Sequence, residues 1–274
     1  MKNFAAIALV AGLSLGTIAC SDDKDDNGTN PTPTPTSDRY LVTTAGSSWI
    51  TSDTTFPADD AESPSYDGSD SVVALAAITK LGKSCTPFVA YREGIATDTT
   101  FMYTENGKVF LYQNLNGFDA PIVEGFTITN VGLGEHWVQV ADQNATGDWT
   151  ALERTSNDLT VQYGQFPLTG KASITIRGRK TGTGTMTINN TSVATASYGI
   201  TATLRFEIAN PLNPATPIVA TIPLSGSYVF GKNVGLVQTA TPAQTVVVSG
   251  TPTGNQEVDL DGSSSTVVRY TIAN

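Results

Sequence analysis

The sequence is poor in the residues that build metal centres and nucleophilic active sites. His136 is its only histidine, so a His-rich metal site is excluded and at most one Ser-His-Asp arrangement is available. The body after the N-terminal segment has no Gly-x-Ser-x-Gly elbow, and no complete phosphate-binding loop or dinucleotide fingerprint occurs. We therefore predict a protein that is not an enzyme, with no cofactor and no metal.

Basic residues, cysteines and long apolar runs are also scarce. Lys and Arg total 15 against 25 Asp and Glu, a net charge of −10, which excludes nucleic acid as a partner because phosphate binding needs clustered cations. There are only two cysteines, Cys20 and Cys85. Beyond the N-terminus no stretch is apolar enough to cross a bilayer, which takes about 20 residues.

The N-terminus has the layout of a secretory signal. Lys2 supplies a positive charge, Phe4 to Leu15 form a short apolar run, and small residues lead to Cys20. A cysteine at the cleavage point resembles a bacterial lipoprotein lipobox, although Thr17 stands where Leu is usual. The resemblance implies that residues 1–19 are removed and that Cys20 carries lipid, which is the predicted attachment to a membrane. Cys85 is then left without an intrachain partner, and we expect it to be a small buried apolar side chain.

Residues 20–38 predict a disordered tether. An acidic run, Ser21 to Asp26, is followed by alternating Pro and Thr from Pro31, which favours an extended spacer because proline lacks an N–H. The acidic run resembles the export signal of Bacteroidota surface lipoproteins. That resemblance implies lipid anchoring in the outer membrane facing the cell surface, with the periplasmic leaflet as the alternative.

The body, residues 39–274, is predicted to be all-β because it is rich in Thr, Ser, Gly and Val, and its length fits one domain or two small ones. Apolar and polar residues alternate from Tyr198 to Ile208, as in a strand with one wet face. Asn106-Gly107 suits the turn of a tight hairpin. Two further strands, Ala172 to Arg177 and Thr183 to Ile188, are expected to be separated by a Gly-rich turn.

Two short segments have less certain interpretations. Ser71 to Leu81 has approximate helical spacing and could end at Gly82 as a cap, or could be a buried strand pair. Ser52 to Phe56 is echoed by Thr97 to Phe101, and we interpret the echo as two turns that each begin at an aspartate.

Two motifs bracket the body. Tyr40 to Trp49 and Tyr228 to Val237 resemble the opening and closing segments of the TapB-like and DUF3108-like group of secreted bacterial β proteins, with Val42 in place of the usual Pro. Because the two motifs bracket nearly the whole body, the resemblance favours a single domain over residues 39–274. It implies a single strongly curved antiparallel sheet or incomplete barrel with an apolar concave face; the alternative is a β-sandwich.

Aromatic side chains are the remaining candidates for binding. We expect Trp149, in a Gly- and Asn-containing loop, to be the most exposed, and we interpret His136 as a packing or rim residue. The predicted function is binding or assembly at the outer membrane; the alternatives are a carrier of a lipid-like or other apolar ligand, and a fibre or surface-layer subunit. An apolar ligand or a protein is the expected partner. The candidate ligand-binding residues are Trp49, Trp137, Trp149, Tyr112 and Phe118.

Overall fold

The computed structural model describes residues 39–58, 62–116, 126–210, 215–251 and 254–273, and the regular structure within them is β-strand. The predicted signal peptide, Cys20 and the tether lie outside the described residues. The strands are β1 (Ser48–Phe56), β2 (Ser65–Gly68), β3 (Ser71–Ala74), β4 (Ile78–Lys80), β5 (Lys83–Arg92), β6 (Ile95–Glu105), β7 (Lys108–Asn114), β8 (Phe126–Asn130), β9 (Glu135–Asp142), β10 (Trp149–Tyr163), β11 (Phe166–Ile188), β12 (Thr191–Ile208), β13 (Ile218–Gly231), β14 (Gly235–Thr241), β15 (Gln244–Thr251), β16 (Gly254–Leu260) and β17 (Gly262–Thr271).

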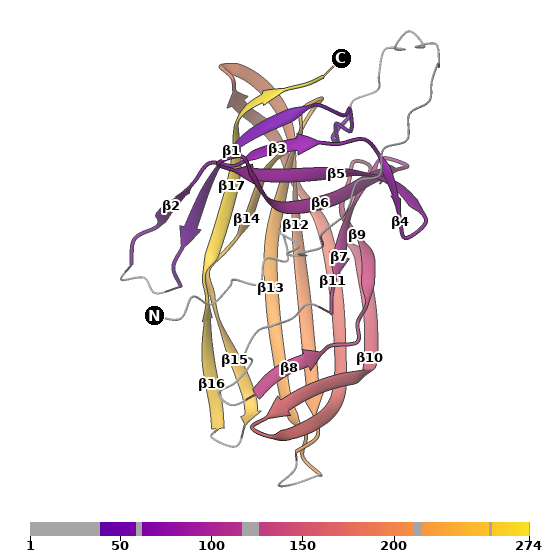
Figure 1. Cartoon of the computed structure of the whole chain (residues 1–274), viewed down its shortest axis with the longest axis vertical. Coiled ribbons are helices and arrows are strands. Elements are labelled where there is room, and N and C mark those ends of the chain that lie inside the picture. Colours follow the sequence, from indigo (N-terminus) through magenta and orange to yellow (C-terminus); the bar gives the residue numbers. More distant parts are fainter. Residues whose placement is uncertain (1–38, 59–61, 117–125, 211–214, 252–253, 274) are drawn as a thin grey trace.

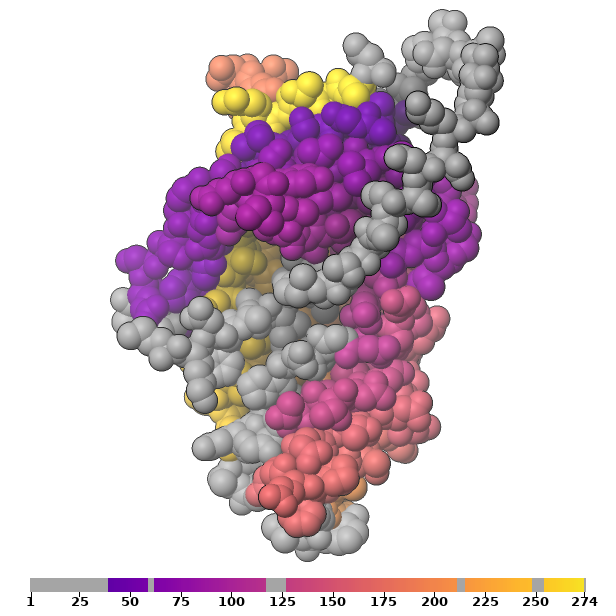
Figure 2. All heavy atoms as spheres, viewed as in Figure 1, coloured from indigo at the N-terminus to yellow at the C-terminus, as the bar shows by residue number. Residues whose placement is uncertain are grey.

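The strands form one large antiparallel sheet that is curved and not closed, which confirms the predicted fold class. Its main ladder runs β9–β7–β6–β5–β3–β1–β17–β14–β13–β12–β11–β10–β8. Figure 1 shows β11, β12 and β13 running much of the length of the molecule, with β5 and β6 crossing its upper part at a steep angle. In the space-filling view of Figure 2, the segment that contains β5 and β6 forms a broad band across the same upper part. The curvature lets a single sheet cover part of its own inner face.

The alternation in β12 builds the centre of the core. Its apolar residues from Tyr198 to Ile208 are between 0% and 3% exposed, while the intervening residues are exposed or half-buried. Leu204 faces Ile174 of β11 on one side and Ile222 of β13 on the other, so three neighbouring strands present their apolar faces together. Each fully buried side chain of this size stabilises the fold by about 1.5–3 kcal/mol.

The two strands expected between residues 172 and 188 are one strand, β11. The ladder to β12 continues through the Gly-rich stretch, with a register shift between Lys180 and Gly182. The prediction of a turn there was wrong, because the chain continues in the same direction and only Thr181 is left out of the pairing, as at a β-bulge.

Two predictions about short segments have clear outcomes. Asn106 and Gly107 form the β6–β7 turn, both with positive φ (52° and 76°), as the hairpin prediction requires. Residues 71–81 contain β3 and β4 and are not a helix, because Val72 and Val73 pair with β1 and β5. Pairing with neighbouring strands has overridden the approximate helical spacing.

The echoed aspartates lie within strands, so the interpretation as turns was wrong. Asp53 is in β1 and Asp98 is in β6. Burial raises the pKa of both carboxyls, and hydrogen bonds oppose the shift, from Ser265 for Asp53 and from the backbone of Thr99 for Asp98. Asp53 also lies 3.3 Å from the guanidinium of Arg92.

The first and last strands of the body are neighbours. β1 pairs with β17 from Ser48↔Thr271 to Phe56↔Gly262, with one register shift after Ile50. The two ends of the folded chain therefore lie side by side in the middle of the sheet rather than at its edges.

Candidate binding site on the outer aromatic cluster

Five aromatic side chains of β6, β7 and β9 gather on the face of the sheet that is turned away from the main core. Tyr103 of β6 faces Phe110 of β7, and Tyr112 of β7 faces Trp137 of β9. Alternate residues of β7 belong to the main core, so these rings form a separate group on the opposite face. We call this group the outer aromatic cluster; its members are Phe101, Tyr103, Phe110, Tyr112 and Trp137.

The rings of the cluster pack by both stacking and edge contacts. Tyr103 and Phe110 are stacked at 4.7 Å between centroids, and Trp137 meets Tyr103 edge-on at 4.8 Å. Tyr112 has edge contacts with Trp137 and Phe101, each at 5.8 Å. Such pairs contribute about 0.5–1.5 kcal/mol each beyond their buried area, so the cluster is held in a fixed arrangement.

Two lysines of the β4–β5 hairpin lie over these rings. The Nζ atom of Lys80 is 4.0 Å from the centroid of Tyr112 and 4.6 Å from that of Phe101. Lys83 Nζ lies 5.4 Å from the Tyr103 centroid and forms an ion pair with Glu105 at 2.9 Å. These distances are within the range of cation–π attraction.

Burial affects the ionisable and polar groups of the cluster. Burial and a hydrogen bond with Glu135 raise the pKa of the Tyr112 phenol, and burial raises that of Tyr103, so both phenols are neutral at physiological pH. Beneath them Cys85 is 2% exposed, as the sequence predicted, and burial raises the pKa of its thiol. The indole Nε1 of Trp137 is buried without a hydrogen-bond partner among the described residues, which is uncommon for a buried donor.

Trp49 and Trp149 lie away from this cluster. Trp49 is in the main core, 4% exposed, where its indole N–H donates to the carbonyl oxygen of Val234 at 2.8 Å. Trp149 is half-buried, as Trp137 is, and its ring lies over Gly178, the residue opposite it in β11. Phe118, the remaining aromatic candidate, falls outside the described residues.

His136 is in β9, next to Trp137 in the sequence, but it is not a member of the outer aromatic cluster. Its Nε2 lies 2.7 Å from the carbonyl oxygen of Leu133, and since a carbonyl only accepts, this nitrogen donates.

The described residues contain no group of three or more His, Cys, Asp or Glu side chains that could hold a metal ion. Nor do they contain a helix long and apolar enough to cross a membrane.

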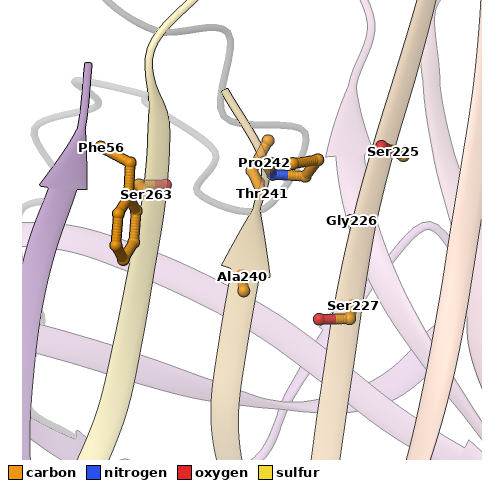
Figure 3. Close-up of a pocket in the computed structure, with 8 residues that line it drawn as sticks. All are labelled: Phe56, Ser225, Gly226, Ser227, Ala240, Thr241, Pro242 and Ser263. Atoms are coloured by element: carbon orange, nitrogen blue, oxygen red, sulfur yellow. The ribbon is translucent and has the colours of Figure 1, made fainter. Parts of the chain in front are cut away.

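A shallow groove lies elsewhere on the sheet, where β14 leaves β13. Figure 3 shows Phe56 of β1 on one side of it and Ser225, Gly226 and Ser227 of β13 on the other, with the end of β14 and Pro242 between them. Its volume is ≈ 400 Å³, which is within the range of small-molecule pockets. None of its lining residues is titratable, so the groove lacks the convergent charged groups that fix a ligand. It is lined by Phe56, Ser225, Gly226, Ser227, Ala240, Thr241, Pro242 and Ser263.

The sequence predicted two of the five cluster members, Tyr112 and Trp137. It missed Phe101, Tyr103 and Phe110, although the register of the predicted hairpin would have placed Tyr103 opposite Phe110. Lys80 gave no local signal, because its place over the rings depends on how β4 folds back on β5.

Comparison with known proteins gives two distant structural likenesses. No family model matches the chain, and no curated protein matches its sequence. A crystal structure of a candidate lipoprotein from Parabacteroides distasonis ATCC 8503 aligns over 85% of this chain and 98% of its own, with 13% identity and a TM-score of 0.42. A candidate exported protein with a YmcC-like fold from Bacteroides fragilis NCTC 9343 aligns over 84% and 98%, with 10% identity and a TM-score of 0.40. Likenesses with TM-scores this low do not assign a function to the chain.

Proposed function

We propose that this chain is a lipid-anchored protein of the outer membrane, facing the cell surface, that binds a partner through the outer aromatic cluster and catalyses no reaction. The anchoring is supported by the lipobox-like sequence before Cys20 and the acidic, Pro-rich run after it. The binding role is supported by one observation above all. A compact group of aromatic rings lies on the outer face of the sheet, separate from the main core.

The cluster has features that a purely structural patch does not need. Phe110, Tyr112 and Trp137 are only half-buried, so part of each ring can be reached from solvent. Tyr and Trp combine a large apolar area with a polar atom, which is why they are enriched where proteins bind partners. The indole N–H of Trp137 is a buried donor without a partner among the described residues, which is uncommon for a side chain that serves packing alone.

The inner face favours binding outside the sheet over carriage within it. Tyr198, Phe206 and Phe230 are all fully buried on that face. Tyr198 meets Phe230 edge-on at 6.0 Å and Trp149 at 6.3 Å. Side chains that interdigitate in this way fill the space that a carrier would reserve for an apolar ligand.

The anchoring is tested with the two cysteines as a matched pair. Cells expressing the wild type, Cys20→Ser or Cys85→Ser are labelled with radioactive palmitate, and intact cells are then treated with a protease. We expect label in the wild type and Cys85→Ser only, and digestion of the labelled protein from outside. Equal labelling of Cys20→Ser would contradict the lipid anchor, and protection of the labelled protein would place it on the periplasmic leaflet.

The binding role is tested by native mass spectrometry of the full chain purified in mild detergent from its own cells. We expect a bound species that is lost in the double variant Tyr112→Ala/Trp137→Ala. Phe166→Ala is the control, because Phe166 is exposed on β11, outside the cluster. The proposal fails if no species binds the wild type, or if the double variant retains it while circular dichroism shows that it is folded.

A further inference from the structure

Lys80 occupies a box formed by two aromatic rings. The rings of Phe101 and Tyr112 are nearly perpendicular, at 82°, with centroids 5.8 Å apart. The Lys80 ammonium lies 4.0 Å from one centroid and 4.6 Å from the other. An ammonium so placed is attracted by both rings at once, as in the aromatic cages that bind cationic ligands. We call the pair Phe101 and Tyr112 the ammonium box.

The contact between Lys80 and the box can be exchanged without unfolding the hairpin. β4 has three residues and pairs with β5 through three residue pairs, Ile78↔Cys85 to Lys80↔Lys83. Within the described residues Lys80 forms no ion pair, whereas Lys83 beside it is paired with Glu105. Because the lysine stem has four carbons joined by rotatable bonds, the Lys80 ammonium can leave the box by rotation of its side chain alone.

The surroundings of the box favour a cationic partner with an apolar flank. Glu135 is hydrogen-bonded to Tyr112, and Glu105 lies beside Tyr103 through Lys83. The whole chain carries a net charge of −10, which attracts cations over long range. On the same hairpin Ile78 and Leu81 are 43% and 49% exposed, and these side chains can contact the residues on either side of a bound lysine.

We propose that the ammonium box is the docking point for a lysine side chain of a protein partner, and that Lys80 occupies it in the free chain. This inference rests on the proposed binding role of the outer aromatic cluster and names the chemistry of the partner. A lysine is specified because a lysine is what the box already holds. The apparent affinity for a partner is the affinity of the empty box multiplied by the fraction of time that the box is empty. Occupation by Lys80 therefore weakens binding of the partner.

The test compares variants that empty the box with one that keeps it filled. Lys80→Met retains most of the stem and removes the charge, whereas Lys80→Arg keeps a cation over the rings. The probe is N-acetyl-lysine N-methylamide, and its uncharged counterpart is N-acetyl-norleucine N-methylamide. Binding of each to the full chain in detergent is measured by isothermal titration calorimetry at constant ionic strength.

We expect Lys80→Met to bind the lysine probe on the order of ten times more tightly than the wild type, with no such gain in Lys80→Arg. Tyr112→Leu added to Lys80→Met should abolish the gain. The inference is overturned if Lys80→Met gains nothing, if Lys80→Arg gains as much, or if the norleucine probe gains equally. Binding of phosphatidylethanolamine vesicles in preference to the lysine probe would also overturn it, because the box would then serve a lipid headgroup.

Failure of this inference and failure of the proposed function give different results. If the cluster binds a partner that carries no lysine, the double variant still loses its bound species in native mass spectrometry while the lysine probe shows no gain. If the cluster binds nothing in the cell, native mass spectrometry shows no species in the wild type. Near-ultraviolet circular dichroism of Lys80→Met checks that the rings remain packed.

Discussion

The three tryptophans differ in what their indole N–H groups do, and a Trp→Phe series should separate them. Trp49 donates to the carbonyl oxygen of Val234 at 2.8 Å and is 4% exposed. Trp149 donates to the carbonyl oxygen of Gln139 at 3.2 Å and is half-buried. The N–H of Trp137 is buried and has no acceptor in the described part of the chain. Each substitution removes the same atoms, so the N–H environment decides the difference between them.

Trp49→Phe should be the most destabilising. It leaves the Val234 carbonyl buried without its donor, which costs about 1–3 kcal/mol, and the smaller ring leaves a void worth about 1 kcal/mol. The expected loss is about 2–4 kcal/mol. Trp149→Phe should cost about 1–2 kcal/mol, because solvent can partly replace the longer hydrogen bond. Trp137→Phe should change stability by about 1 kcal/mol or less in either direction, since removing an unpaired buried donor offsets the void.

Urea unfolding of the full-length chain, followed by far-ultraviolet circular dichroism, measures the series without depending on the fluorophores that are removed. The slope of the free energy against urea should be unchanged, so that the shift in midpoint reports stability alone. The reasoning is refuted if Trp137→Phe costs as much as Trp49→Phe, or if Trp49→Phe costs less than about 1 kcal/mol.

Three further outcomes can be measured in the same way. Gly178→Ala should cost about 1–3 kcal/mol, since a Cβ there would lie 2.3 Å from the Trp149 ring, whereas Gly182→Ala has open space and should cost nothing; equal costs would contradict the close approach. Asp98→Asn should stabilise the protein at pH 7 and have no effect near about pH 2. Burial raises the pKa of Asp98, so its contribution to the free energy of unfolding is lost as pH rises through the folded pKa. A stabilisation that is independent of pH would refute this cause. Phe230→Ala should cost about 3–5 kcal/mol, because Phe230 is fully buried; a loss below about 1 kcal/mol would show that the site is not packed.

What the sequence could predict of the fold was local. The alternation from Tyr198 to Ile208 and the Asn106-Gly107 turn are set by neighbouring residues, and both predictions are confirmed. The errors arose where distant strands decide the outcome. Residues 71–81 are drawn into strands by β1 and β5. Asp98 stays in the middle of β6 because β5 pairs with it there, although an aspartate before two threonines also suits a turn.

The candidate site was predictable to the extent that it depends on a single hairpin. Tyr112 was named, and the register of β6 and β7 could have added Tyr103 and Phe110. The cation could not be predicted, because Lys80 reaches the rings through a three-residue strand that pairs only with part of β5. The presence of an aromatic residue did not by itself indicate a binding position, since Trp49 is buried in the main core.

The neighbouring positions of β1 and β17 set the order in which the molecule can be completed. About 200 residues separate Phe56 from its partner Gly262, and at about 5–20 residues per second a ribosome needs roughly 10–40 s to make that stretch. During this time β1 lacks the strand that joins it to β14. Pairing over so long a separation is also slow in itself. The sheet therefore cannot be joined between β1 and β14 until β17 has been made, and for that time β1 has an unpaired edge that can meet other chains.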